Sequence, residues 1–178
     1  MEKKSKKIAV LVEDYFEEAE LTIPIKILEK NKMKVTIISS SSKRLKSMKG
    51  RENGNDFNAD LLLDEASSKD YDALILPGGI FNADQLRMNE KAQAWAIDFI
   101  DNNKLVAASS YAPWLLVSAD LVEEKKLTST PTLKDDVCNA GGEWTNRPVV
   151  VDGNLITSRG GEDIEKFAAS IIDWLDKR

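Results

Sequence analysis

Short apolar runs alternate with amphipathic segments along most of the chain. Four runs rich in Val, Ile, Leu and Ala predict buried strands, in residues 7–12, 34–39, 71–79 and 104–109. Amphipathic or polar stretches separate these runs, so the pattern favours a parallel sheet with helices on both faces. The expected fold class is therefore an α/β three-layer sandwich with a mostly parallel sheet.

Helical spacing of apolar residues predicts the segments that connect the strands. Leu21, Ile25 and Leu28 recur at that spacing within residues 17–31. Asn89 is a plausible N-cap for a helix over residues 89–103, because its side chain can accept a hydrogen bond from a free backbone amide. Two further helices are predicted, over residues 113–119 and 162–177.

The remaining segments carry weaker signals. Residues 39–60 are polar and predict irregular structure with a short hairpin, and residues 132–142 predict a short helix closed by glycine. Asp152-Gly153 predicts the turn of a hairpin over residues 148–158. With no internal repeat or linker, residues 1–178 are interpreted as a single domain, and residues 1–6 as a disordered tail.

Length and composition narrow the class of protein. A chain of 178 residues buries about 70% of its unfolded surface, so its core needs no disulfide or metal. Cys138 is the single cysteine, which rules out an intrachain disulfide and fits the cytoplasm. With 30 acidic and 25 basic residues and no basic face, the sequence predicts no nucleic-acid partner. No apolar run suggests a signal peptide or membrane span.

The chain contains no histidine. A Ser-His-Asp or Cys-His mechanism is therefore excluded within this chain. Zinc sites built on histidine are excluded as well, and one cysteine cannot supply a site rich in thiolates. We accordingly expect no metal and no cofactor. Cys138 itself is interpreted as a small, partly buried apolar residue of the predicted helix rather than a redox sensor.

A candidate site lies where the apolar run at residues 104–109 gives way to Ser110, Tyr111 and Ala112, followed by Pro113. A strand that turns sharply into a helix is where many α/β enzymes place a nucleophile. Ser110 is therefore either a nucleophile or a remaining polar residue in a pocket that has lost its chemistry. Trp114 follows the proline and is interpreted as core packing or as part of the pocket mouth.

Four motifs in register resemble the ThiJ/PfpI superfamily, and most closely its PfpI-type intracellular peptidase-like branch. They are ILPGG at 75–79, LVSADLV at 116–122, LTSTPTLKDDVCNAGGEW at 127–144 and VVVDGNLITSR at 149–159. The resemblance covers nearly the whole chain. It implies a flavodoxin-like fold, similar to that of class I glutamine amidotransferases, and assembly into dimers or, in some members, hexamers.

The resemblance also implies which residues occupy the family's catalytic positions. The family's corner reads Cys-His-Gly-Pro, which here corresponds to Ser110, Tyr111, Ala112 and Pro113. The family's helix glutamate, which hydrogen bonds to the cysteine, is kept as Glu20. In this chain Ser110, Tyr111 and Glu20 are thus the vestigial catalytic set.

Four further residues are candidate binding residues. Gly78 and Gly79 could offer backbone amides to an oxyanion or could simply form a turn. Asp84 matches an acidic residue that some members contribute across a subunit interface, although a cap at a helix start is the simpler interpretation. Thr130 stands where the branch usually has tyrosine.

The replacement of the family's cysteine and histidine by Ser110 and Tyr111 makes nucleophilic catalysis at this corner less favourable. A cysteine thiol has an ordinary pKa near 8.5, whereas a serine hydroxyl is closer to water, at about 15.7. A glutamate with an ordinary pKa of about 4.3 is a poor base for that hydroxyl, and tyrosine cannot replace histidine. We expect Glu20 to hydrogen bond to Ser110 and backbone amides, and Glu17 and Glu18 to lie on the solvated side of their helix.

The preferred interpretation is a cytoplasmic, non-catalytic family member that binds a small molecule or a protein, with a role in stress response suggested by the family alone. The expected pocket is bounded by Glu20, Gly79, Ser110 and Tyr111. The alternative is an active hydrolase, peptidase, glyoxalase or deglycase that uses Ser110 with Glu20. A third possibility is a structural subunit that pairs with an active paralogue.

Overall fold

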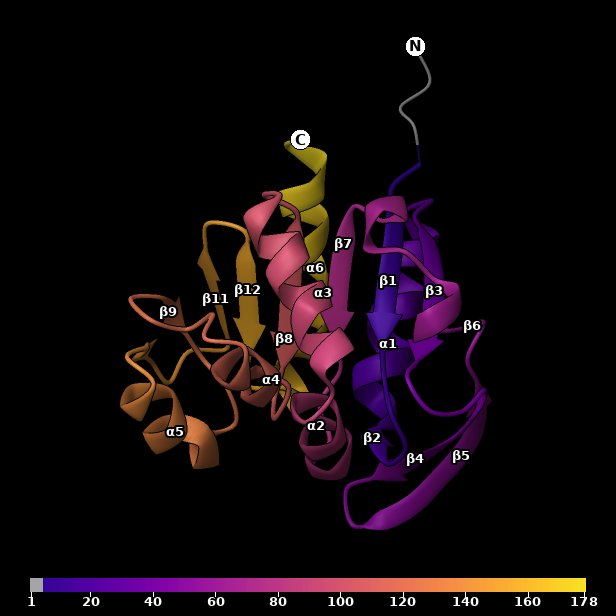
Figure 1. Ribbon diagram of the computed structural model, residues 1–178, viewed down its shortest axis with the longest axis horizontal. Coiled ribbons are helices and arrows are strands. Elements are labelled where there is room, and N and C mark those ends of the chain that lie inside the picture. The colour runs from indigo at the N-terminus through magenta and orange to yellow at the C-terminus, as the bar shows by residue number, and fades with distance from the viewer. Residues whose placement is uncertain (1–4) are drawn as a thin grey trace.

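The structure, a computed structural model, describes residues 5–178 and contains a seven-stranded sheet within that range (Figure 1). Its strand order is β11-β12-β8-β7-β1-β3-β6, and every neighbouring pair is parallel except β11 and β12. The strands are β1 (Lys7–Leu11), β3 (Lys34–Ser39), β6 (Leu61–Leu62), β7 (Ala73–Leu76), β8 (Leu105–Ser109), β11 (Val149–Asp152) and β12 (Leu155–Ser158).

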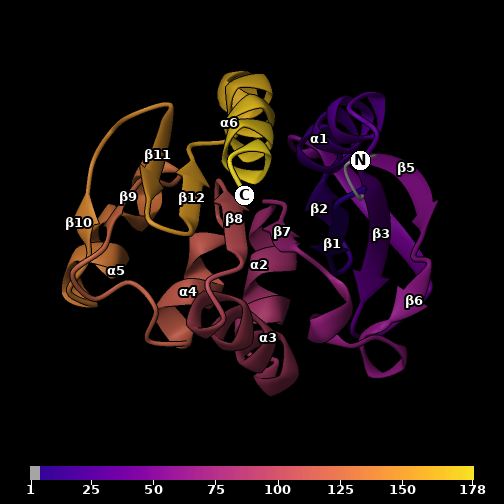
Figure 2. The ribbon, with the colours of Figure 1, turned by 90° about the horizontal axis from the view of Figure 1, so that it is seen from above.

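Helices cover both faces of this sheet (Figure 2). One face carries α1 (Glu18–Lys30) and α6 (Ile164–Asp176), and the other carries α2 (Ile80–Arg87), α3 (Glu90–Asp101) and α4 (Pro113–Ser118). The helix α5 (Lys134–Asn139) lies beyond β12. Short 3₁₀ turns occur at Leu63–Glu65, Ser68–Asp70, Pro131–Leu133 and Gly161–Asp163. The predicted α/β/α sandwich is confirmed.

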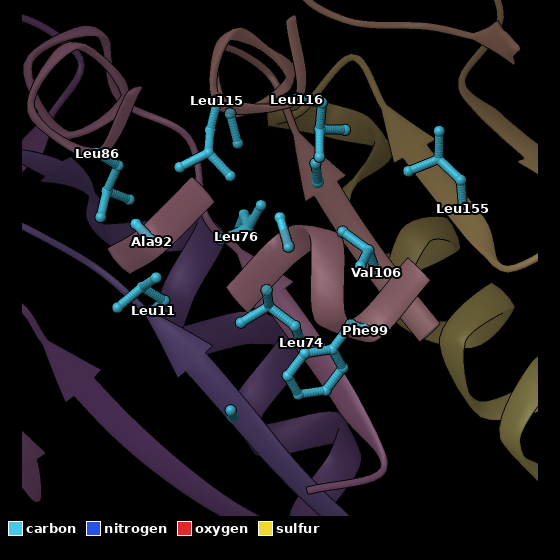
Figure 3. Close-up of a cluster of buried hydrophobic side chains, with 14 of the residues drawn as sticks. Leu11, Leu74, Leu76, Leu86, Ala92, Phe99, Val106, Leu115, Leu116 and Leu155 are labelled. Atoms are coloured by element: carbon cyan, nitrogen blue, oxygen red, sulfur yellow. The ribbon is translucent and has the colours of Figure 1, made fainter. Parts of the chain in front are cut away.

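Successive side chains of a strand point to opposite faces of the sheet, which explains why the fold has a hydrophobic core on each face. In β1, Ala9 and Leu11 point to one face and pack in a cluster with Phe99 of α3 (Figure 3). Ile8 and Val10 point to the other face and pack with helices α1 and α6. Because parallel strands are buried on both faces, they read as continuous apolar runs in the sequence.

The segment after β3 is more regular than predicted. The strands β4 (Arg44–Lys49) and β5 (Glu52–Asn58) form an antiparallel hairpin, and β2 (Phe16–Glu17) pairs with β4. This hairpin extends past the carboxyl ends of the central strands (Figure 1). A second small sheet pairs β9 (Lys126–Leu127) with β10 (Glu143–Trp144). The hairpin predicted within residues 39–60 is therefore confirmed, whereas the prediction that the rest of the segment is irregular is wrong for most of its length.

Other local predictions have mixed outcomes. Asn89 caps α3, since its side chain accepts hydrogen bonds from the amides of Lys91 and Ala92. No helix was predicted for residues 80–87, where α2 lies. The hairpin of β11 and β12 pairs Asp152 with Leu155, so Gly153-Asn154 forms its turn rather than Asp152-Gly153. Gly153 has a φ of +59°, a left-handed conformation that glycine adopts without strain.

Part of the predicted tail is bonded to the fold. Residues 1–4 lie outside the described residues, whereas the Ser5 hydroxyl donates to the carbonyl of Lys32 at 2.5 Å. The carbonyl of Lys6 accepts from the amide of Lys34 at 2.8 Å. Among residues 5–178, no helix is both long and apolar enough to cross a membrane.

Candidate functional site

The predicted corner after β8 is present and is conformationally strained. Ser110 has a φ of +57°, a left-handed conformation that side chains other than glycine rarely adopt. Its amide donates to the carbonyl of Ser158 at 2.9 Å, and its carbonyl accepts from the amide of Thr130 at 3.0 Å. These two backbone bonds hold the corner, and Pro113 then starts α4. Ser110 therefore occupies a strained turn between a strand and a helix.

Glu20, the third residue of α1, is buried beside this corner, with 3% of its surface exposed. Its Oε2 atom accepts hydrogen bonds from the Gly78 amide at 2.9 Å and from the Ser109 hydroxyl at 2.5 Å. We expected Ser110 as the hydroxyl partner, and this expectation is wrong. The reason is geometric, because strand residue Ser109 points to the α1 side of the sheet whereas Ser110 occupies the turn.

Glycines on two segments leave room for the Glu20 carboxyl. A Cβ atom on Gly78 would lie 2.4 Å from Oε2, and one on Gly160 would lie 2.5 Å from Oε1. The same two Cβ atoms would lie 2.6 and 2.7 Å from the Cβ atom of Ser110. Any larger residue would displace the carboxyl. Both segments therefore need glycine for the carboxyl to reach this position.

Burial raises the pKa of Glu20 to about 7, because the charged form loses its hydration. Hydrogen bonds from Ser109 and from the Gly78 and Gly161 amides oppose this shift, since they favour the charged form, and the nearby carboxylate of Glu17 adds to it. Near neutral pH, Glu20 is therefore a mixture of the neutral acid and the carboxylate.

A pocket of about 410 Å³ opens at the corner. Its polar lining includes Glu17, Glu20, Arg51 and Ser110. Its apolar lining comes from Tyr15, Met48, Ile80, Phe81 and Tyr111. The structure thus brings Glu20, Gly79, Ser110 and Tyr111 to one pocket.

The two glycines of the turn Pro77-Gly78-Gly79 differ in whether their amides are already hydrogen bonded. The Gly78 amide is engaged by Glu20, which removes it from the candidate oxyanion donors. Gly79 has a φ of +102°, and a Cβ atom there would lie 2.7 Å from the backbone nitrogen of Glu17, so the turn requires glycine. The turn interpretation therefore holds for Gly79, and a role of its amide as an oxyanion donor stays a prediction. Its amide has no hydrogen-bond partner among residues 5–178.

Asp84 and Thr130 do not line the pocket. Asp84 is exposed in the interior of α2, whose N-cap is Gly79, so the interpretation of Asp84 as a cap is wrong. A contribution of Asp84 across a subunit interface stays a prediction. Thr130 contacts the site through its backbone amide, which donates to the Ser110 carbonyl.

The β4–β5 hairpin supplies pocket residues that the sequence analysis missed. Met48, Gly50 and Arg51 line the pocket, but their polar surroundings gave no signal of a site. Two glutamates of the α1 start bind this hairpin. Glu17 accepts from the Gly50 amide at 3.1 Å, and Glu18 accepts from the Ser47 hydroxyl and the Asn55 amide, each at 2.8 Å.

The two glutamates were expected to face solvent, which is wrong because both are half-buried against the hairpin. The bond from the Asn55 amide, helped by Ser47 and Lys49, lowers the pKa of Glu18 to about 2. Glu18 therefore stays charged and can hold the hairpin at any ordinary pH.

Two more residues lie away from the pocket. The Trp114 indole donates to Asp136 of α5 at 3.0 Å, and the Arg87 guanidinium lies 4.9 Å from its ring centre, so Trp114 packs between helices. Cys138 is exposed, so its predicted partial burial is wrong. Across residues 5–178, no cluster of three or more Cys, Asp or Glu residues is arranged to hold a metal ion.

Comparison with known proteins gives consistent results over the whole fold. A Drosophila melanogaster DJ-1beta structure matches with a TM-score of 0.89 and 27% identity, covering 98% of this chain and 92% of that one. A ThiJ/PfpI domain protein from Brachyspira murdochii matches with a TM-score of 0.91 and 25% identity, covering 99% of each chain.

Similarity extends to curated proteins at the level of sequence. Protein/nucleic acid deglycase 2 of Escherichia coli is 38% identical over 164 residues, or 92% of this chain and 94% of that protein. General stress protein 18 of Bacillus subtilis is 34% identical over 173 residues, or 97% of this chain and 99% of that one. The model of the DJ-1/PfpI family matches residues 6–174. The chain belongs to the DJ-1/PfpI family.

Proposed function

We propose that this family member binds a small molecule in the pocket at the Ser110 corner and does not perform nucleophilic catalysis there. One observation carries the proposal. The Oε2 atom of Glu20 already accepts from Ser109 and Gly78, and no hydrogen bond joins Glu20 to Ser110 within the described residues. The carboxyl that should act as the base is therefore engaged elsewhere.

The chain offers no better base. It has no histidine, and the position after Ser110 holds Tyr111. A nucleophilic serine needs a base within hydrogen-bond reach that can accept its proton in the transition state. The pocket still has the volume and the apolar lining of a ligand site. Binding without turnover is the function that fits both facts.

A hydrolase or deglycase that uses Ser110 with Glu20 is the second candidate. The pKa of Glu20, about 7, makes its carboxylate a stronger base than an ordinary glutamate. Ser110 also keeps the strained backbone of a nucleophile corner. The relative named as a deglycase supports this candidate by name. It would require Glu20 to exchange its bond with Ser109 for one with Ser110.

A serine-directed fluorophosphonate probe separates the two candidates. We expect no labelling of Ser110 by peptide mapping, and no glyoxalase, deglycase or peptidase activity above that of a Ser110→Ala control. Labelling of Ser110, or turnover lost in that variant, would establish the second candidate instead.

The biological setting is part of the proposal. We place the protein in the cytoplasm as a homodimer or a hexamer, with a role in stress response, and the name of the relative General stress protein 18 supports that role. Light scattering of the purified protein tests the assembly. A monomer at micromolar concentration would contradict it.

A further inference from the structure

The pocket contains hydrogen-bond donors for which the fold supplies no acceptor. Ser110 as a whole residue is 9% exposed, and its hydroxyl has no hydrogen-bond partner in the described part of the chain. The amides of Gly79 and Tyr111, two other pocket residues, also have no partner within residues 5–178. Free donors that line a pocket are normally matched by water or by a ligand.

One positively charged side chain lines the pocket together with these donors. Arg51, at the turn of the β4–β5 hairpin, is the only Lys or Arg among the described residues that line this pocket. The hairpin that carries it is held in place, because Glu17 binds the Gly50 amide and Glu18 binds Ser47 and Asn55. Its guanidinium is a planar, permanently charged group that suits a carboxylate.

The rest of the lining is apolar. Tyr15 and Phe81 are in edge-to-face contact, with ring centres 6.0 Å apart, and they are 36% and 57% exposed. Met48 and Ile80 extend this apolar surface within the same pocket. Contact between these side chains and an apolar ligand is favourable, because it removes aromatic and aliphatic surface from water.

From this combination we infer that the pocket binds a small monocarboxylic acid with an apolar body, with the carboxylate at the donors of Gly79, Ser110 and Tyr111 and near Arg51. The inference rests on the proposed function, because it names the ligand class of the same pocket. The ligand brings two acceptor oxygens to donors that lack acceptors, and its body covers the aromatic rim.

The charged side chains around the pocket allow an anion to bind there. Glu17 and Arg51 offset each other, and Glu20 carries no charge while it is protonated. On the segment behind Glu20, Arg159 is paired with Asp163 at 2.8 Å and so adds no net charge. A neutral carbonyl compound would use the same donors but would gain nothing from Arg51, which makes Arg51 the discriminating residue.

Phenylacetate and its neutral isostere phenylacetamide test the inference by calorimetric titration at pH 6, with NMR to locate the binding. We expect phenylacetate to bind about tenfold more tightly than the amide, the size of effect that one charge-assisted contact supplies. This preference should vanish in Arg51→Gln. It should persist in Arg44→Gln, which changes an arginine of the same hairpin outside this pocket.

Each other outcome has a distinct meaning. Equal affinity for the two compounds, a preference that survives in Arg51→Gln, or no binding of phenylacetate at the pocket overturns the carboxylate inference and leaves the non-catalytic proposal standing. Hydrolysis of phenylacetamide that disappears in Ser110→Ala overturns the non-catalytic proposal itself.

Discussion

The hydroxyl of Ser109 donates to the buried carboxyl of Glu20 at 2.5 Å, although Ser110 is the residue at the corner. Ser109 and Ser110 are adjacent in sequence, but one ends a strand and the other occupies a left-handed turn. This one-residue difference decides which hydroxyl the carboxyl can polarise.

Glu20 should make folding stability depend on pH. Its pKa is about 7 in the folded protein and has an ordinary value of 4.5, so the folded state binds the proton more tightly. The contribution of Glu20 to the free energy of unfolding should therefore be greatest below pH 4.5 and fall as pH rises to about 7, by about 3 kcal/mol. Urea denaturation of Glu20→Gln should show this decline removed.

Glu29→Gln is the matched control, because Glu29 is an exposed glutamate of the same helix. It should keep the decline seen in the parent protein. An unchanged pH dependence in Glu20→Gln would mean that Glu20 is not the group responsible.

Ser109→Ala should raise the pKa of Glu20 further. The Ser109 hydroxyl lowers this pKa by bonding to the charged form, so removing it favours the neutral acid. Carbon NMR titration of the glutamate side chains would follow the shift. Ser110→Ala should leave the titration nearly unchanged because Ser110 makes no bond to Glu20. A shift caused by Ser110→Ala alone would contradict the bonding described above.

The layers of the fold could be predicted from the sequence, because continuous apolar runs identify strands buried on both faces. The site could be predicted only in part. The motif around Glu20 and Ser110 predicted that the two share a pocket, but their spacing along the chain holds no information on which hydroxyl meets the carboxyl. Arg51 and Met48 reach the pocket through a hairpin of polar residues, whose pairing depends on Glu17 and Glu18 rather than on its own apolar pattern.

Gly79→Ala should destabilise the protein more than Gly153→Ala. Both glycines have positive φ, so each substitution carries backbone strain of about 1 kcal/mol or more. A Cβ atom on Gly79 would also lie 2.7 Å from the Glu17 nitrogen, whereas nothing lies within 4 Å of one on Gly153. Thermal unfolding of the two variants measures the difference. Equal losses would show that the turn at Gly79 can relax.

Restoring the family's residues at the corner after β8 should restore catalytic turnover. The variant Ser110→Cys, Tyr111→His, Ala112→Gly supplies a thiol with an ordinary pKa near 8.5, an imidazole and more steric room. We expect measurable glyoxalase or deglycase turnover, and none in the matched variant that lacks the Ser110→Cys change. Absence of turnover in a folded triple variant would show that other residues around the corner have changed too, with Thr130, whose amide bonds to the Ser110 carbonyl, the first to examine.

Carboxylate binding should weaken as Glu20 ionises. Below its pKa of about 7 the carboxyl is neutral, and above it the pocket gains a negative charge beside the ligand. The affinity for phenylacetate should therefore fall between pH 6 and pH 8, while that for phenylacetamide should change little. In Glu20→Gln the affinity for phenylacetate should become independent of pH over this range. A fall that persists in Glu20→Gln would assign the titration to another group, and a rise would show that the bound species is not the anion.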